Sequence, residues 1–284
     1  MTLNKALALA TKTLASAEIE HPHIEAELLL CHILGISKAQ LYSEPEKILS
    51  AAEINKLKDS LQHRLLRKPI SYITKYCEFY GIELYVDQRV LIPRPETELL
   101  VEKALEFAHQ RSPSENQFTI ADIGTGSGAI AISLSLALPQ AKVYATDISA
   151  SALQVASINC QRHKVNGRVV LLQGNLLEPL PHPVDVIIAN LPYIKDCELE
   201  SLSPEIRDFE PGVALLGGED GLDKIRQILD QIPGKIRPGA CFLLEIGQEQ
   251  DEAVTSLINK NFPQANVDLI PDLSGINRVV KAIL

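Results

Sequence analysis

The sequence lacks long hydrophobic runs, an excess of basic residues and regular cysteine spacing, and each absence excludes a class of protein. Its longest apolar stretch, Ala129 to Leu138, is far shorter than the ~20 residues of a membrane-spanning helix. A net charge of −9 at pH 7 disfavours a broad basic surface for nucleic acid. Residues 1–17 lack the apolar core and cleavage site of a secretory signal. We therefore expect a cytoplasmic protein without membrane contact.

The five cysteines are scattered, with neither a CxxC pair nor a histidine motif nearby: Cys31, Cys77, Cys160, Cys197 and Cys241. Such spacing indicates reduced thiols, mostly acting as small buried apolar residues, rather than a disulfide framework. We expect no metal site.

At 284 residues, 46% of them hydrophobic, the chain is long enough for two domains. Residues 1–70 show helical periodicity, which predicts a small helical bundle. Its expected apolar faces are Leu3, Leu7 and Leu14; Ile24, Leu28 and Cys31; and Ile54, Leu57, Leu61 and Leu65. Aromatic and β-branched residues around Gly81 predict a hairpin within Tyr72 to Val86, in a linker spanning 71–92.

Residues 93–284 predict a doubly wound α/β domain with a sheet of about seven strands. A helix with Pro95 near its first turn should run to about Arg111. The strands that we expect are Thr119 to Ile123, Lys142 to Thr146, Arg168 to Leu172, Val184 to Ala189, Cys241 to Glu245, Ala265 to Ile270 and Arg278 to Leu284. The helices between them are Ala129 to Leu138, Ala150 to His163, Gly221 to Gln231 and Glu249 to Asn259.

A glycine-rich turn joins the first of these strands to its helix: Gly124, Thr125, Gly126, Ser127 and Gly128. Glycines let a backbone approach a ligand in conformations that side chains forbid. The spacing is GxGxG rather than GxGxxG, so a dinucleotide is the weaker reading, and an ordinary tight turn is the alternative. Nineteen residues beyond Gly128, Asp147 ends the next strand, where a carboxylate can accept hydrogen bonds from both hydroxyls of a ribose.

A second polar segment, Asn190-Leu191-Pro192-Tyr193, follows the apolar run Val184 to Ala189. Ligands of open α/β sheets bind at the carboxyl ends of strands, although a plain strand-to-loop turn would have the same pattern. The segment resembles the Asn-Pro-Pro-Tyr motif of methyltransferases that act on a planar NH2 group, with Leu191 in place of the first proline. The glycine turn and Asp147 likewise resemble the first motifs of class I S-adenosylmethionine-dependent methyltransferases.

These resemblances imply roles for individual residues. S-adenosyl-L-methionine would lie across Gly124 to Gly128, with its ribose on Asp147 and its adenine beside Asn175 and Leu176. Many relatives have Asp at position 175, and Asn175 could instead be a loop cap. The Asn190 side-chain oxygen and the Leu191 carbonyl would accept hydrogen bonds from the two N–H groups of the acceptor amide, while Tyr193 stacks on its plane. No catalytic histidine or other general base is expected.

Several further blocks point to one family: Leu91 to Glu98, Asn190 to Ile194, Phe209 to Pro211, Gly217 to Leu222, Glu245 to Gln248 and Asp272 to Gly275. Together with the glycine loop they resemble the HemK/PrmC family of peptide chain release factor glutamine methyltransferases. The resemblance implies methylation of the glutamine amide in the Gly-Gly-Gln motif of class I release factors, with the helical domain as a second clamp on this protein substrate. Arg94 would border the active site, or be a surface charge at a helix start.

Three rival functions remain. A paralogue that methylates a glutamine of a ribosomal protein shares the amide chemistry. A DNA adenine methyltransferase also presents an NH2 group, but it normally needs a target-reading domain and a basic groove, and neither is visible in this acidic chain. A nucleotide-binding regulator or dehydrogenase with an incidental tetrapeptide is the third. We expect a monomer that does not bind nucleic acid directly.

Overall fold

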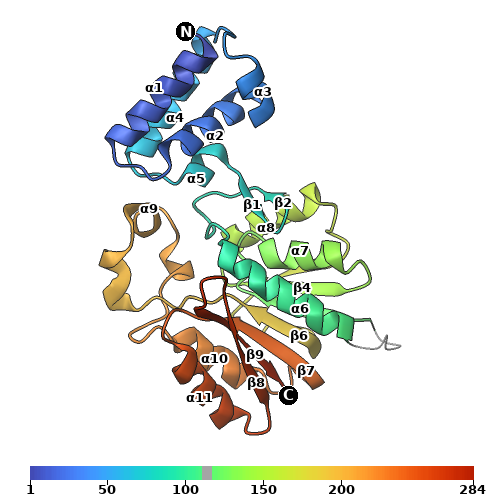
Figure 1. Ribbon diagram of the computed structural model, residues 1–284. Coiled ribbons are helices and arrows are strands. Elements are labelled where there is room, and N and C mark those ends of the chain that lie inside the picture. Colours follow the sequence, from blue (N-terminus) through green and yellow to red (C-terminus); the bar gives the residue numbers. More distant parts are fainter. Residues whose placement is uncertain (111–116) are drawn as a thin grey trace. The chain divides into compact units, whose positions relative to one another are not determined.

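The computed structural model describes residues 1–110 and 117–284, which form two compact units (Figure 1). One unit, here the helical unit, comprises Met1–Tyr76 together with Ser203–Phe209. The other, here the sheet unit, comprises Cys77–Leu202 and Glu210–Leu284. The helical unit is therefore built from two separate stretches of sequence.

Six of the described helices make up the helical unit. They are α1 Leu3–Ser16, α2 Pro22–Leu34, α3 Lys38–Ser43, α4 Ala51–Leu65, α5 Ile70–Thr74 and α9 Pro204–Arg207. Capping boxes begin α3 and α4: the Ser50 hydroxyl accepts from the Glu53 N–H, and the Glu53 carboxylate accepts from the Ser50 N–H. Each box satisfies backbone donors that a helix start leaves without a partner. Leu3, Leu7 and Leu14 enter the core as predicted.

The predicted buried face of α2 is wrong. Ile24 and Leu28 are 51% and 44% exposed, whereas Leu29 and Leu30 are fully buried. Three leucines in succession satisfy more than one helical phase, so periodicity does not decide which of them faces inward. Contact with α1 and α4 decides it.

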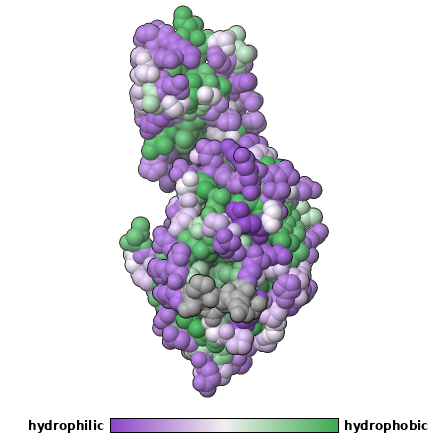
Figure 2. Space-filling view, turned by 90° about the vertical axis from the view of Figure 1, so that its right-hand side faces the viewer, coloured by the Kyte–Doolittle hydropathy of each residue, from purple (hydrophilic) through white to green (hydrophobic). Residues whose placement is uncertain are grey.

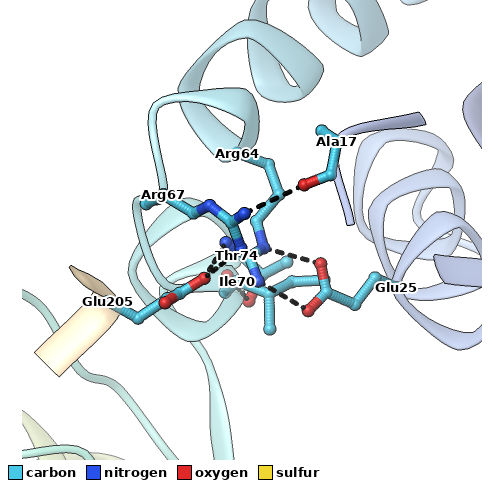
Figure 3. A network of polar contacts seen from close by, with 7 residues as sticks. All are labelled: Ala17, Glu25, Arg64, Arg67, Ile70, Thr74 and Glu205. Atoms are coloured by element: carbon cyan, nitrogen blue, oxygen red, sulfur yellow. Dashed lines mark hydrogen bonds and ion pairs between the residues drawn. The ribbon is translucent and has the colours of Figure 1, made fainter. Parts of the chain in front are cut away.

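A buried ion network ties α9 to the rest of the helical unit (Figure 3). The Arg64 guanidinium donates to both oxygens of Glu25, at 2.7 and 3.2 Å, and to Glu205 of α9 at 3.0 Å. Arg67 donates to Glu205 at 3.4 Å and to the Ala17 carbonyl at 3.0 Å. With its side chain only 6% exposed, Arg64 is a buried charge that depends on both carboxylates.

The predicted hairpin is shorter than expected. It consists of β1 Cys77–Phe79 and β2 Ile82–Leu84, paired antiparallel, while Tyr72 lies in α5 and is fully buried. A β-rich composition does not reveal this helical turn, because burial of Tyr72 overrides local propensity. Gly81 makes the turn between the strands with φ +71°.

The expected doubly wound fold is confirmed in the sheet unit, whose described residues form a seven-stranded sheet in the order β5-β4-β3-β6-β7-β9-β8. The strands are β3 Thr119–Ile123, β4 Lys142–Asp147, β5 Val169–Gln173, β6 Val184–Ala189, β7 Ile236–Glu245, β8 Asn266–Pro271 and β9 Asn277–Ile283. Strands β3 to β7 pair in parallel, and β9 is antiparallel to both β7 and β8.

Helices cover both faces of this sheet. They are α6 Glu98–Gln110, α7 Ala129–Ala137, α8 Ala150–Arg162, α10 Asp223–Gln231 and α11 Asp251–Asn261, with shorter turns η1 Pro95–Thr97, η2 Asp196–Ser201 and η3 Gly212–Ala214. On β3, Ala121 and Ile123 join the core with α10 and α11, while Asp122 between them bonds α7. This alternation places the two groups of helices on opposite faces. The predicted end of α6 at Arg111 lies outside the described residues.

Polar and apolar side chains are interspersed on the visible surface of each unit (Figure 2). Among the residues that the structure describes, no helix is long and apolar enough to cross a membrane.

In the sheet, β3 lies between β4 and β6, so the order in which the strands follow along the chain reverses at β3. Such a switch point opens a crevice at the carboxyl ends of the strands.

Replacing Arg64 by Ala should lower the free energy of unfolding by about 3 kcal/mol, because two partly buried carboxylates lose their shared cation. Urea denaturation measures this change. Lys47→Ala is the matched control: its ion pair with Glu44 has side chains 40% and 50% exposed, and its loss should cost at most about 1 kcal/mol. Equal losses from the two substitutions would contradict the structural importance of the network.

Candidate active site

A pocket opens at the carboxyl ends of β3, β4, β5 and β6, entirely within the sheet unit. Eight of the predicted site residues line it: Gly124, Gly126, Asp147, Asn175, Leu176, Asn190, Leu191 and Pro192. Sequence reasoning did not assign the other lining residues to the site, although Leu91 and Pro211 lie in blocks that resemble the family; these residues are Arg89, Val90, Leu91, Thr146, Ile148, Ser149, Ala152, Gly174, Pro211, Val213, Ala214 and Lys224. Residues 89–91, before the glycine loop, and residues 211–224, after Asn190 to Tyr193, thus complete the pocket wall.

The glycine loop forms one side of the pocket with its backbone. Gly124, Gly126 and Gly128 have φ of +73°, +55° and +85°, a conformation that costs other residues roughly 1–2 kcal/mol. The Thr146 carbonyl accepts from the N–H groups of Gly124 and Thr125, both at 2.9 Å. These bonds fasten the loop to β4.

The side chains of the loop point away from the pocket. Thr125 donates to the buried Asp122 carboxylate at 2.6 Å, and the Ala131 N–H donates to the same oxygen at 3.1 Å. Burial raises the pKa of Asp122 to about 7 despite these hydrogen bonds. Ser127 is also buried. The pocket is therefore not lined by Thr125, Ser127 or Gly128. These residues stabilise the loop on its side away from the pocket.

Asp147 stands at the end of β4 with its carboxylate in the pocket wall. One oxygen accepts from the Gly126 N–H and the other from the Ser149 N–H, both at 2.9 Å. Burial raises the pKa of this carboxyl, and hydrogen bonds from the backbone of Ser149, Gly126 and Ile148 oppose the rise. Asp147 thereby links the glycine loop to the start of α8.

Asn175 and Leu176 lie on the pocket wall after β5. The Asn175 amide nitrogen donates to the Glu178 side chain at 3.0 Å, a local bond of the kind that a loop-capping residue makes. Leu176 has a left-handed backbone with φ +52°, and its carbonyl accepts from the Thr146 hydroxyl at 2.9 Å. Their assignment to the adenine stays a prediction.

Asn190, Leu191 and Pro192 reach the pocket from the end of β6. The Leu191 side chain is only 4% exposed and belongs to the main core. A Cβ placed on Gly124 would lie 3.5 Å from its Cδ2 atom. The leucine that replaces a proline of the motif is thus anchored by packing beneath the glycine loop.

Residues 215–221 hold the loop after β6 in place. The Ile194 N–H donates to the Leu215 carbonyl at 3.0 Å, and the Gly217 N–H donates to the Ile194 carbonyl at 2.8 Å. A Cβ on Gly217 would lie 2.6 Å from the Pro192 carbonyl oxygen, and one on Gly221 would lie 2.3 Å from that of Tyr193. These approaches explain why glycines occupy both positions.

Behind Asn190 lies a hydrogen-bonded pair that sequence reasoning missed. The Asn190 Nδ2 atom donates to the Thr97 hydroxyl at 3.0 Å, and that hydroxyl donates to the Glu245 carboxylate at 2.7 Å. Burial raises the pKa of Glu245 to about 7, while the Thr97 hydrogen bond opposes the rise. Thr97 and Glu245 lie in sequence blocks that had pointed to a family, but nothing local in those blocks indicates that they meet.

Tyr193 and Arg94 do not line the pocket itself. Burial raises the pKa of Tyr193 to about 12, so the phenol stays neutral, and nearby Glu245 raises it further. Arg94 donates to Glu210 at 2.5 Å, and the Glu210 side chain is only 1% exposed. This ion pair ties Arg94 to residues 209–211, and the two readings of Arg94, a surface charge and a border of the active site, stay predictions.

Comparison with known proteins identifies the family. The family described as PrmC N-terminal domain matches residues 5–74, and the one described as Methyltransferase small domain matches residues 97–203. A release factor glutamine methyltransferase of Koribacter versatilis is 39% identical over 282 residues, covering 99% of this chain and 98% of that protein. One of Moorella thermoacetica is 41% identical over 279 residues, covering 98% and 97%. This chain belongs to the release factor glutamine methyltransferase family.

Solved structures show that the family shares its fold with other methyltransferases. A methyltransferase from Pyrococcus furiosus is 18% identical, with a TM-score of 0.52, over 78% of this chain and 96% of that one. The catalytic domain of hMettl16, solved in complex with a MAT2A 3'UTR hairpin, is 12% identical, with a TM-score of 0.57, over 85% and 83%. At these identities the likeness concerns the class I methyltransferase fold alone.

Gly221→Ala should destabilise this family member more than Gly234→Ala, as urea denaturation can measure. Both glycines have φ +77°, but a Cβ on Gly234 meets nothing within 4 Å. Gly234→Ala should therefore cost only the backbone conformation, about 1 kcal/mol. Gly221→Ala adds a collision with the Tyr193 carbonyl, about 1–3 kcal/mol more. A difference near zero would show that the close approach is easily relieved.

Proposed function

We propose that this chain transfers a methyl group from S-adenosyl-L-methionine to the side-chain amide nitrogen, N(5), of the glutamine in the Gly-Gly-Gln motif of class I peptide chain release factors. The observation that supports this most directly is the position of Asn190. It lines the same pocket as the glycine loop and Asp147, and its amide nitrogen is engaged by Thr97. Its oxygen Oδ1 has no hydrogen-bond partner among residues 1–110 and 117–284, so it can accept from a substrate N–H.

The pocket fits S-adenosyl-L-methionine, which supplies an electrophilic methyl group when bound. Gly124 and Gly126 leave its wall free of side chains, so a ligand can approach the backbone. The Asp147 carboxylate already accepts two N–H groups and retains further lone pairs for ribose hydroxyls. Ile148, next in sequence and 57% exposed, adds an apolar surface to the pocket, which suits one face of an adenine ring.

Acceptor atoms at the end of β6 would hold the glutamine amide. An amide nitrogen is a weak nucleophile because its lone pair is delocalised into the carbonyl group. Asn190 Oδ1 and the Leu191 carbonyl would each accept one N–H of the substrate. The pair would orient the nitrogen and stabilise the positive charge that develops on it.

Tyr193 would stack on the amide plane rather than move a proton. Because its pKa is raised to about 12, the phenol is neutral at physiological pH and is a poor base. Methyl transfer to nitrogen makes its remaining protons strongly acidic. The surplus proton can pass to water, and no general base is required in the proposed mechanism.

The helical unit would supply a second contact with the release factor. Residues 5–74 match the PrmC N-terminal domain, which supports a function for these helices that other members of the family share. A protein substrate offers a larger surface for binding than a glutamine side chain alone. The division of labour that we propose assigns residues 1–70 to substrate binding, 71–92 to the linker and 93–284 to catalysis, although α9, within the last range, belongs to the helical unit.

Asp147→Ala should weaken the binding of S-adenosyl-L-methionine at least about tenfold, because a carboxylate that accepts hydrogen bonds is lost. Isothermal titration calorimetry measures the affinity. Asp59→Ala is a charge-matched control in the helical unit, where the Asp59 side chain is 72% exposed, and it should leave the affinity unchanged. Binding of NAD by the native protein, with no binding of S-adenosyl-L-methionine, would refute the cofactor assignment.

Incubation with isotopically labelled methyl donor and purified release factor should place one methyl group on the Gly-Gly-Gln glutamine, as mass mapping of peptides would show. Asn190→Ala should lower kcat by about 10²-fold, in the range for loss of one transition-state hydrogen bond. Asn261→Ala, at the exposed end of α11, is the control and should retain full activity.

Two results would contradict this assignment. Full transferase activity in Asn190→Ala would mean that the side-chain oxygen does not hold the acceptor amide. Methylation of a ribosomal protein, with the release factor unmodified in a parallel reaction, would favour the paralogous function.

A further inference from the structure

The amide of Asn190 is linked to a buried carboxylate, Glu245, through the Thr97 hydroxyl, and hydrogen bonding from Asn190 itself also lowers the pKa of that carboxyl. Asn190 follows β6, Thr97 ends η1, and Glu245 ends β7. Thr97 lies 93 positions from Asn190 and 148 from Glu245 in the chain, yet the two hydrogen bonds are 3.0 and 2.7 Å long. The fold thus brings three separate segments together directly behind the proposed acceptor site.

The direction of these hydrogen bonds follows from chemistry. An ionised carboxylate can only accept, so Thr97 must direct its one hydroxyl proton at Glu245. The Thr97 oxygen then has only lone pairs left for Asn190. Asn190 must therefore present Nδ2 to Thr97, and its oxygen Oδ1 is turned the other way.

Burial makes this arrangement costly to disturb. Thr97 is 5% exposed and Glu245 is 3% exposed, so solvent does not readily replace a lost partner. A buried polar atom without a hydrogen bond costs roughly 1–3 kcal/mol. The inverted amide would place Oδ1 against the lone pairs of Thr97 and leave Nδ2 toward the substrate, where a donor would repel the N–H groups of an incoming glutamine.

We infer that Thr97 and Glu245 are positioning residues, which hold the Asn190 amide with Oδ1 facing the acceptor nitrogen. The inference rests on the proposed function, because Oδ1 is the atom that would accept from the glutamine. The same hydrogen bonds limit the freedom of Asn190, which here precedes Leu191 rather than the proline of the motif that the segment resembles.

Protonation of Glu245 should release this orientation. A neutral carboxylic acid can donate to the Thr97 oxygen, and the Thr97 hydroxyl can then donate to Asn190. Asn190 is then no longer required to direct Nδ2 at Thr97. Burial raises the pKa of Glu245 most and Glu96 on η1 raises it further, whereas hydrogen bonds from Thr97 and Asn190 and the charge of Arg278 on β9 lower it. Tyr193, neutral at these pH values, lies nearby. With a Glu245 pKa of about 7, kcat should fall as the pH drops below neutrality, since only the ionised form orients Asn190.

The first test observes the amide itself and requires no methyl transfer. In a ¹⁵N–¹H correlation spectrum, the Asn190 side-chain NH2 signals are assigned by their absence in Asn190→Ala. In the native protein they should shift with a midpoint near pH 7, between about pH 6 and pH 8. Glu245→Gln should abolish this titration, and Thr97→Val should reduce its amplitude, because only the contact of Asn190 with Glu245 itself then remains. Signals that titrate identically in Thr97→Val, or do not titrate in the native protein, would overturn the inference.

The second test uses methylation of the release factor. Thr97→Val, which removes the hydroxyl but keeps the shape, should lower kcat about tenfold, equivalent to one net hydrogen bond, with KM for the release factor within about twofold. Thr97→Ser should restore most of the rate, and Glu245→Gln should flatten the acid limb of the pH profile. Native kcat in Thr97→Val would refute the positioning role.

The two tests separate this inference from the proposed function. If the native protein leaves the release factor unmethylated, the proposed substrate is wrong, and the spectrum of Asn190 still decides whether Glu245 and Thr97 orient its amide. If the native protein methylates the release factor and Thr97→Val does so equally fast, the function stands and the positioning role falls.

Discussion

The site depends on how closely two glycines approach the carbonyl groups of Pro192 and Tyr193. Gly217 and Gly221 leave room for these carbonyls where a Cβ would lie 2.6 and 2.3 Å from their oxygens. The backbone pairing of Ile194 with residues 215–217 is possible only at this separation. The loop after β6 is thereby fixed on its outer side, while Leu191 anchors it to the core on its inner side. Both the proposed cofactor wall and the acceptor atoms depend on that fixed path.

Buried carboxyl groups are a second feature of this sheet edge. Asp122, Asp147 and Glu245 all have their pKa raised chiefly by burial, yet each accepts hydrogen bonds from hydroxyl or backbone N–H groups. Each carboxyl also joins two structural elements: Asp122 holds the glycine loop to the adjoining α7, whereas Asp147 joins that loop to α8 and Glu245 reaches η1 across 148 positions. These carboxyl groups therefore hold the elements around the pocket together, and Asp147 can also contact a ligand.

Local patterns in the sequence predicted the strands, the order of motifs and the pocket-lining residues Gly124, Asp147 and Asn190, because strand ends and glycine turns have short-range signatures. They did not predict the partners of Asn190. Thr97 and Glu245 are brought to it by the sheet topology, and no periodicity encodes a contact across 93 or 148 positions. The prediction of the buried face of α2 was wrong for a related reason. Three successive leucines are compatible with several choices of buried face, and packing against neighbouring helices selects one. The helical turn at Tyr72 was hidden by residue types that favour strands.

The ion network around Arg64 bears on where the protein can be divided. Helix α9 is encoded after the active-site loop, yet it completes the amino-terminal helical unit through Glu205. The backbone therefore passes between the two units at three places rather than one. A fragment that begins at residue 77 would retain α9 without its partners, and a fragment that ends at residue 76 would leave Arg64 with one carboxylate in place of two. The helices before residue 77 are thus not a detachable module, and any exchange of this region between relatives must carry residues 203–209 with it.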